Sequence, residues 1–382
     1  MARTRIQGLT KLFKGNPPTT AADNLDLDIE EGEFLVLLGP SGCGKTTTLR
    51  CLAGLEAPDA GRISIGGKVV FDASAGIEVA PDKRSIGMVF QSYALWPHMT
   101  VRKNIEYPLV VRKIAQGLRE GWTEQMARMV NCEGLLERYP GQMSGGQQQR
   151  ISLARGLVAR PDLLLLDEPL SNLDKLLRDQ VRSQLHELHR RLAFSAVFVT
   201  HDQSEALALG DRLAIMRSGR IEQLDTAREV FERPATEYVA NFIGMHNRVP
   251  LEYRDGLWHG AGEPMEGNAI SLPGGQREAV ARVRPEDLSV ELPQQALHPD
   301  AVGMAGTVVD ATFAGRRFDV VVQVGNQRYQ AWAPSGMDDR QDYPPGMAVR
   351  VAFRRANAVF YDTQGQRIGE QRAARMAEDS AT

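Results

Sequence analysis

The chain has 382 residues, of which 42% are hydrophobic and 24% are charged. That length predicts two or three domains, and that composition is ordinary for a folded protein with large cores. The formal net charge is −3, so there is no overall basic field that would favour nucleic acid. The three cysteines lack metal-type spacing and fit a reducing compartment. No run approaches the ~20 apolar residues of a membrane span, and the first residues lack a signal-peptide core, so we expect any membrane role to depend on a partner.

The first forty residues predict three strands, over residues 3–9, 25–29 and 34–38. The last of these is a continuous apolar run and is expected to be buried. Phe13 lies in a polar stretch between the first two strands. Its ring could stack on a nucleotide base or could be a packing residue, and the sequence leaves both open.

A glycine-rich loop follows the third strand and fits G-x-x-x-x-G-K-[ST] at every fixed position. It consists of Gly39, Pro40, Ser41, Gly42, Cys43, Gly44, Lys45 and Thr46. A helix is predicted directly after it, over residues 46–55. Glycines let the backbone aim N–H groups at phosphate oxygens, and the helix start adds positive potential. Lys45 can reach the outer phosphates and the Thr46 hydroxyl can ligate Mg²⁺. The alternative is a turn that binds nothing, which the flanking strand and helix disfavour.

The middle of the chain changes from strands to helices. Residues 61–70 predict a hairpin and residues 85–90 a strand that ends at Gln91. Helices are then predicted over residues 100–109, 123–136 and 147–158, which together indicate a helical subdomain inserted at about residues 92–160. Ser144, Gly145, Gly146 and Gln147 open the last helix, an arrangement that suits an anion but is weak on its own.

Carboxylates follow the next buried strand. Four leucines, residues 163–166, lead into Asp167 and Glu168. These emerge at a strand's carboxyl end, where open α/β sheets bind ligands, so Asp167 suits Mg²⁺ and Glu168 suits a general base. The alternative is a strand followed by an acidic helix cap. Asp174 begins a long amphipathic helix, and His201 ends the strand predicted at residues 196–200, where we expect a phosphate contact.

Composition shifts from Tyr238 onward. Residues 250–300 are rich in proline, glycine and charge, and strands are predicted over residues 306–310, 318–324, 329–332 and 348–353. Gly325 and Asn326 predict a tight hairpin turn, and residues 371–382 are polar and expected to fray. We therefore predict two domains: an α/β P-loop NTPase over residues 1–237 and, over residues 238–382, a linker followed by a small all-β domain of barrel type.

Together these motifs resemble the ATP-binding-cassette (ABC) ATPases over roughly residues 3–243. In chain order they are Walker A from Gly39 to Thr46, the Q-loop glutamine Gln91, the signature Ser144 to Gln147 with Met143 in place of leucine, Walker B with Glu168, the D-loop with Asp174, and the switch histidine His201. Residues 91–98 and 232–236 resemble importer ATPases for sugars, polyamines and ferric ion. Residues 282–286 and the β region after them resemble that group's C-terminal oligosaccharide-binding-like (TOBE) domain. Residues 206–216 and residues 242–244 with Asn247 resemble the polyamine and ferric members more than the sugar members.

The resemblance implies an ATP sandwich between two copies of the chain. It assigns nucleotide contacts to Phe13, Gly39, Pro40, Ser41, Gly42, Cys43, Gly44, Lys45, Thr46 and Thr47, and across the dimer to Ser144, Gly145, Gly146, Gln147 and Asp174. It places Mg²⁺ at Thr46, Gln91 and Asp167, and catalysis at Glu168, His201 and Gln91. ATP-driven closure and opening of the dimer would then move attached membrane subunits.

The implied partners are a second copy, transmembrane permease subunits and, indirectly, a solute-binding protein, with the chain on the cytoplasmic face of the inner membrane and no nucleic acid bound. The solute is expected to be a polyamine or ferric ion, with a sugar or an organophosphonate as alternatives. Two rival classes are a soluble cassette ATPase acting on DNA or ribosomes and a non-hydrolysing regulator. A single phosphate loop without long heptads disfavours the first, and the presence of Glu168 and His201 disfavours the second.

Overall fold

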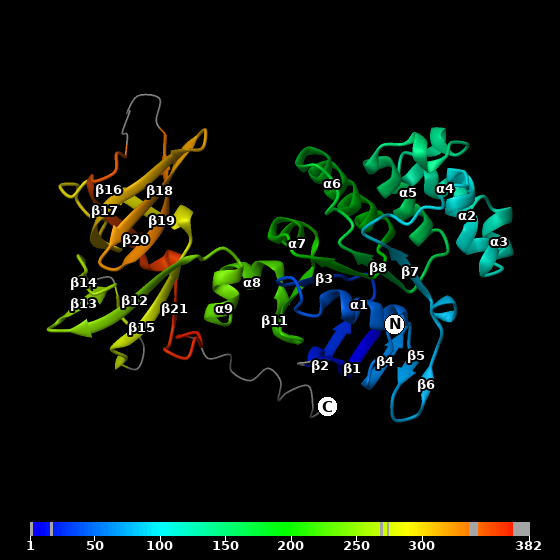
Figure 1. The fold of residues 1–382 in the computed structure, drawn as a ribbon, viewed down its shortest axis with the longest axis horizontal. Helices are drawn as coiled ribbons and strands as arrows, with labels where there is room; N and C mark the ends of the chain where they lie inside the picture. Colours follow the sequence, from blue (N-terminus) through cyan, green and yellow to red (C-terminus); the bar gives the residue numbers. More distant parts are fainter. Residues whose placement is uncertain (1–2, 16–17, 268–269, 273–274, 336–342, 370–382) are drawn as a thin grey trace. The chain divides into compact units, whose positions relative to one another are not determined.

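The computed structural model describes residues 3–15, 18–267, 270–272, 275–335 and 343–369. The chain divides into two compact units, Met1–Arg228 and Glu229–Thr382 (Figure 1). The first unit contains a six-stranded and a five-stranded sheet with the helices α1 to α7, and the second contains two five-stranded sheets.

The six-stranded sheet of the first unit has the order β11-β10-β3-β9-β8-β7. Its strands are β3 (Phe34–Leu38), β7 (Ile86–Val89), β8 (Leu163–Asp167), β9 (Ala196–Thr200), β10 (Arg212–Arg217) and β11 (Arg220–Thr226). All neighbours are parallel except β10 and β11. Every residue of β3, β8 and β9 is buried, because a parallel sheet is covered on both faces. The continuous apolar runs that predicted these three strands follow from that burial.

An antiparallel sheet of order β2-β1-β4-β5-β6 completes this core. Its strands are β1 (Thr4–Phe13), β2 (Thr19–Ile29), β4 (Ala60–Ile65), β5 (Lys68–Asp72) and β6 (Ile77–Glu78). Helix α1 (Lys45–Ala53) lies between the two sheets, and its Leu49 and Leu52 share one apolar cluster with both (Figure 1). The first two strands are longer than predicted, because polar residues occupy their exposed positions and hide the pattern.

Four helices pack together beside the parallel sheet (Figure 1). They are α2 (Val101–Val111), α3 (Ala115–Arg119), α4 (Trp122–Met129) and α5 (Gly145–Leu157). The helices predicted near residues 100–109 and 147–158 are confirmed. The helix predicted over residues 123–136 is wrong in its second half: Asn131 adopts a left-handed φ of 55°, and the Cys132 N–H bonds the carbonyl of Ala127, which ends α4.

Two further helices of the first unit are α6 (Lys175–Leu192) and α7 (Gln203–Leu209). The apolar stripe predicted for α6 is buried at Val181, Leu185 and Leu188. No helix in the described part of the chain has both the length and the apolar character needed to cross a membrane.

The second unit is built on antiparallel strands. They are β12 (Asn247–Arg254), β13 (Leu257–Gly260), β14 (Glu263–Pro264), β15 (Glu278–Val283), β16 (Leu288–Glu291), β17 (Ala301–Phe313), β18 (Arg317–Val324), β19 (Gln327–Pro334), β20 (Ala348–Arg354) and β21 (Ala358–Tyr361). They form sheets of order β14-β13-β12-β15-β21 and β16-β20-β17-β18-β19 around one apolar cluster. The four strands predicted here are confirmed, as is the turn at Gly325 and Asn326, because Val324 pairs with Gln327.

The structure adds short strands that were not predicted, β12 to β16 and β21, because charges and turn residues break their alternation. The tail predicted to fray, residues 371–382, lies outside the described residues.

Two arginines, Arg282 in β15 and Arg284 just after it, bond the preceding helices to the second unit. These helices are α8 (Ala227–Glu232) and α9 (Glu237–Phe242). Arg282 bonds the Glu237 carboxylate at 2.8 Å and the Asn241 side chain at 3.1 Å. Arg284 donates to the Phe231 carbonyl at 2.6 Å and its guanidinium lies 3.8 Å from the centroid of that ring. The division therefore falls between Arg228 and Glu229, whereas composition alone suggested residues 237 and 238.

Candidate functional site

The glycine-rich loop connects β3 to α1, as the sequence predicts, and two of its positions admit only glycine. Gly44 has a φ of 105°, and a Cβ there would lie 1.9 Å from the Ala21 carbonyl oxygen. At Gly39 a Cβ would lie 2.5 Å from the Met216 carbonyl oxygen. The loop is held down by the Gly219 N–H, which donates to the Cys43 carbonyl at 3.0 Å. The loop's path is therefore fixed by contacts from distant parts of the first unit.

The Lys45 ammonium lies at the centre of this loop. Its Nζ donates to the carbonyls of Gly39 at 2.7 Å and Pro40 at 2.9 Å, and the residue is buried. Thr47 in the first turn of α1 is half-buried. Carbonyls attract the ammonium less than ionised phosphate oxygens do. The loop therefore holds a cation that polyphosphate can engage at the start of a helix.

Thr46 and Asp167 come together at the carboxyl edge of the parallel sheet. The Thr46 hydroxyl donates to Asp167 Oδ1 at 3.2 Å. Burial raises the pKa of the Asp167 carboxyl, while the bond from Thr46 and the positive charges of Arg50 and Lys45 act in the opposite direction. A hydroxyl and a carboxylate oxygen are ligands that Mg²⁺ prefers, and a bound cation would offset the cost of burying this charge. The residues present fit that ion.

Glu168 and His201 form a second pair at the same edge. Glu168 Oε2 lies 3.4 Å from His201 Nδ1. Glu168 has a left-handed φ of 43°, and its N–H donates to the Val199 carbonyl at 3.1 Å. The backbone is thus held in an uncommon conformation that brings the carboxylate beside the imidazole, the kind of strain that occurs at functional sites.

The remaining residues predicted on this chain's own side are exposed. Phe13 ends β1 and is 40% exposed, with the Lys11 ammonium 5.3 Å from its ring centroid. It is therefore outside the core, which disfavours the packing alternative. Gln91 is exposed, and its backbone carbonyl accepts from Asn172 Nδ2 at 2.9 Å. Asn172 was missed by sequence reasoning, although its place between two motifs was a usable signal.

The signature residues begin α5 and lie next to the start of α6. Ser144 and Gln147 form a capping box: the Ser144 hydroxyl accepts from the Gln147 N–H at 3.4 Å and the Gln147 side chain accepts from the Ser144 N–H at 3.0 Å. Gly145 and Gly146 lie against leucines near the start of α6. Asp174 caps α6 by accepting from the Leu177 N–H at 3.0 Å. In the described part of the chain no hydrogen bond joins this group to the glycine-rich loop.

Comparison with known proteins identifies both units. Residues 22–171 match the family model described as ABC transporter, and residues 281–360 match the TOBE domain. A trehalose/maltose import ATP-binding protein from Thermococcus litoralis is 46% identical over 67% of this chain and 68% of its own. A spermidine/putrescine import ATP-binding protein from Nitratidesulfovibrio vulgaris is 39% identical over 91% of this chain and 94% of its own. An Fe(3+) ions import ATP-binding protein from Brucella suis is 42% identical over 83% and 87%. The chain therefore belongs to the ABC transporter family and is an importer ATPase subunit with a C-terminal TOBE domain.

Proposed function

We propose that this chain hydrolyses ATP with Glu168 as general base and Mg²⁺ at Thr46 and Asp167, and that the reaction drives import of a small solute through a membrane permease. The observation that carries the assignment is the pairing at one sheet edge. Thr46 lies 3.2 Å from Asp167, and Glu168 lies 3.4 Å from His201. A base, its imidazole neighbour and two cation ligands thus surround the end of a phosphate loop.

Each residue then has one task. Lys45 and the N-terminus of α1 hold the phosphates, and Glu168 orients and deprotonates the attacking water. His201 contacts the γ-phosphate, and Gln91 offers an exposed amide at the same end of the sheet. Thr46 and Asp167 would hold Mg²⁺, which would supply positive charge to stabilise the transferring phosphoryl group. Phe13 stacks on the base through its exposed ring.

A second copy of the chain completes the site. Ser144 is exposed at the start of a 13-residue helix, and Gly145 beside it is half-buried. An exposed helix N-terminus that makes no hydrogen bond to its own phosphate loop is available to the nucleotide of another copy. Each ATP would then lie between the loop of one copy and the residues 144–147 of the other. Loss of the γ-phosphate removes a contact that holds the dimer closed.

The permease is expected to dock after Gln91. Tyr93 and Trp96 are the two large aromatic residues of this segment, and each could be a docking anchor or a core residue. Tyr93 is 8% exposed, and its carbonyl accepts from Ser152 at 2.8 Å, so it is a core residue. Trp96 is half-buried, 4.2 Å from the ring of Tyr107 and 4.8 Å from the guanidinium of Arg155. It lines a groove of about 330 Å³ that can receive a helix of the permease.

We propose a polyamine or ferric ion as the solute and the cytoplasmic face of the inner membrane as the location, with a solute-binding protein as indirect partner. The support is the resemblance at residues 206–216 and Asn247, and a polyamine importer relative that matches along almost the whole chain. Relatives named for sulfate/thiosulfate and sn-glycerol-3-phosphate import match over similar lengths, so the ranking is tested directly. Stimulation of ATPase in the reconstituted transporter by a sugar alone would reverse it.

The site itself is tested by a lysine pair. Lys45→Ala removes the ammonium from the loop, whereas Lys103→Ala removes an exposed ammonium from α2. We expect the first variant to lose nucleotide binding in a fluorescent-nucleotide titration, and the second to bind and hydrolyse ATP normally. Equal binding by both variants would refute the assignment of the phosphate site.

A further inference from the structure

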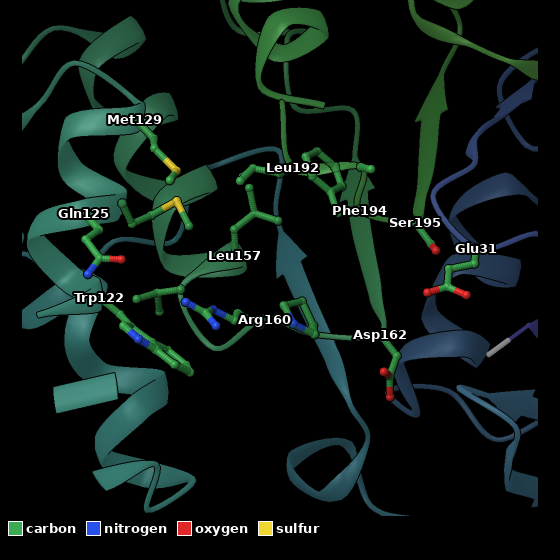
Figure 2. Close-up of a pocket in the computed structure, with 14 residues that line it drawn as sticks. Glu31, Trp122, Gln125, Met129, Leu157, Arg160, Asp162, Leu192, Phe194 and Ser195 are labelled. Carbon is green, nitrogen blue, oxygen red and sulfur yellow. The ribbon is translucent and has the colours of Figure 1, made fainter. Parts of the chain in front are cut away.

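A second cavity, shown in Figure 2, lies at the amino ends of β8 and β9. Its volume is about 400 Å³, within the range of small-molecule sites. Asp162 and Ser195, which immediately precede β8 and β9, line it. The nucleotide residues Asp167 and His201 lie at the other ends of the same two strands. The cavity and the nucleotide site therefore lie at opposite ends of the same two strands.

The elements that carry the nucleotide residues at one end line this cavity at the other. Strand β8 has five residues and spans about 16 Å, and α5 has 13 residues and spans about 20 Å. Leu157, the last residue of α5, lines the cavity, whereas Ser144 caps the start of the same helix. Leu192, the last residue of α6, also lines the cavity, whereas Asp174 caps the start of that helix. A ligand here would contact the far ends of the elements that position the nucleotide residues.

The walls come from both parts of the first unit. Trp122 and Met129 belong to α4 of the helical group, and Phe194 precedes β9 of the sheet (Figure 2). Methionine side chains adapt to different ligand shapes, and the two aromatic rings offer flat apolar faces. An apolar body bound here would join the helical group to the sheet.

The charges of the cavity favour a cation at one end. Figure 2 shows Glu31 and Asp162 on the opposite side of the cavity from Trp122. Neither carboxylate forms an ion pair within the described residues, whereas the Arg160 guanidinium lies 3.7 Å from the centroid of the Trp122 ring. A cation would be attracted to the carboxylates and repelled from Arg160, which sets the direction of an amphiphilic ligand.

We propose that this cavity is a regulatory site for an amphiphilic organic cation, with its apolar body against Trp122 and Phe194 and its charge near Glu31 and Asp162. Because the ligand contacts both the helical group and the sheet edge, it favours the arrangement in which both line one cavity and slows any cycle that changes it. Binding is independent of the proposed hydrolysis mechanism, and only the effect on turnover rests on it.

The test uses the full-length protein and two probes with the same body, 4-phenylbutylamine and 4-phenylbutyrate. Isothermal titration calorimetry without nucleotide is expected to show saturable binding of the amine and at least tenfold weaker binding of the carboxylate. The double variant Glu31→Gln/Asp162→Asn should lose about tenfold in amine affinity, since each exposed carboxylate contributes about threefold. Asp255→Asn, an exposed aspartate of the second unit, is the matched control and should bind as the parent does.

A second measurement follows ATP turnover at saturating ATP. The amine should lower the turnover of the parent and of Asp255→Asn, and the double variant should need about tenfold more amine for the same effect. Equal or tighter binding of 4-phenylbutyrate, or unchanged amine affinity in the double variant, would overturn the cation site. Binding without any change in turnover of an active enzyme would overturn the regulatory role. An inactive parent that still binds the amine would instead contradict the proposed hydrolysis mechanism.

Discussion

The parallel sheet of the first unit and the antiparallel sheets of the second place charged residues differently. In the first, Asp167 ends the buried strand β8, Glu168 comes directly after it and His201 comes directly after the buried strand β9, so the three gather at one edge. In the second, charged side chains hold strands and helices together: Arg350 bonds the carboxylates of Glu266 at 2.8 Å and Glu291 at 2.7 Å. Parallel strands align their carboxyl ends and so concentrate polar groups, whereas antiparallel strands alternate their ends. Sheet direction thus explains why polar groups gather at one edge of the parallel sheet, while both units contain stabilising ion pairs such as Arg212 with Glu33 and Arg350 with Glu266.

The largest expected difference between the units comes from neutralising one glutamate in each. Glu168→Gln should keep ATP affinity and lower kcat by roughly 10²–10⁴, the range for loss of a general base. Glu252→Gln, on an exposed position of β12, should leave kcat unchanged. Mg²⁺-dependent phosphate release and a nucleotide titration measure both quantities. Near-normal turnover of Glu168→Gln would show that the base lies elsewhere.

A pair of aromatic residues in the first unit separates core from docking surface. Tyr93→Ala should lower the free energy of unfolding by about 3–5 kcal/mol, because it empties a buried aromatic site. Trp96→Ala should lower the free energy of unfolding by under about 2 kcal/mol. The isolated variant should still hydrolyse ATP but should fail to assemble with the permease. Urea unfolding and co-purification with permease subunits distinguish them. Normal coupling by a destabilised Trp96→Ala variant would defeat the docking role.

The stabilising pairs of the second unit are tested by two arginines that share one partner. Both Arg282 and Arg248 bond Glu237 at 2.8 Å, but their side chains are 11% and 46% exposed. Arg282→Ala should lower the free energy of unfolding by about 3 kcal/mol, because the nearly buried guanidinium bonds Asn241 and the Met245 carbonyl as well as Glu237. Arg248→Ala should lower the free energy of unfolding by under about 1 kcal/mol, because exposed ion pairs contribute little to stability. Unfolding followed by the fluorescence of Trp258 and Trp332, with the other two tryptophans replaced, measures both, and equal costs would contradict the assigned burial.

The smallest expected effect comes from removing the second unit altogether. A chain ending at Arg228 keeps every residue assigned to the nucleotide site, so its ATP affinity should change by about threefold or less, the range for distant independent sites. The cut belongs after Arg228 because α9 is bonded to β15 of the second unit. A folded fragment that no longer bound ATP would make the second unit part of the site.

Much of the proposed nucleotide site could be predicted from sequence because each of its segments follows a local pattern. A continuous apolar run predicted β8, and the residues that follow it had to emerge at the strand's carboxyl end. The loop from Gly39 to Thr46 is likewise defined by residue type and spacing, since its φ angles and close backbone contacts admit glycine alone at Gly44. Side chains whose role depends on a neighbouring strand or helix start could be placed without knowing the whole fold.

Tertiary structure decided what depends on distant residues. The sequence could not show that Tyr93 is buried while Trp96 lines a groove, because both are large and apolar and only the assembled fold decides which of them is covered. It could not place the division at Arg228, because the bonds of Arg282 to α9 cross 41 and 45 positions. The cavity lined by Trp122 and Asp162 depends on the meeting of helix and strand ends that no local pattern encodes. Local patterns fix strands, loops and caps, whereas burial and charge pairing are properties of the assembled fold.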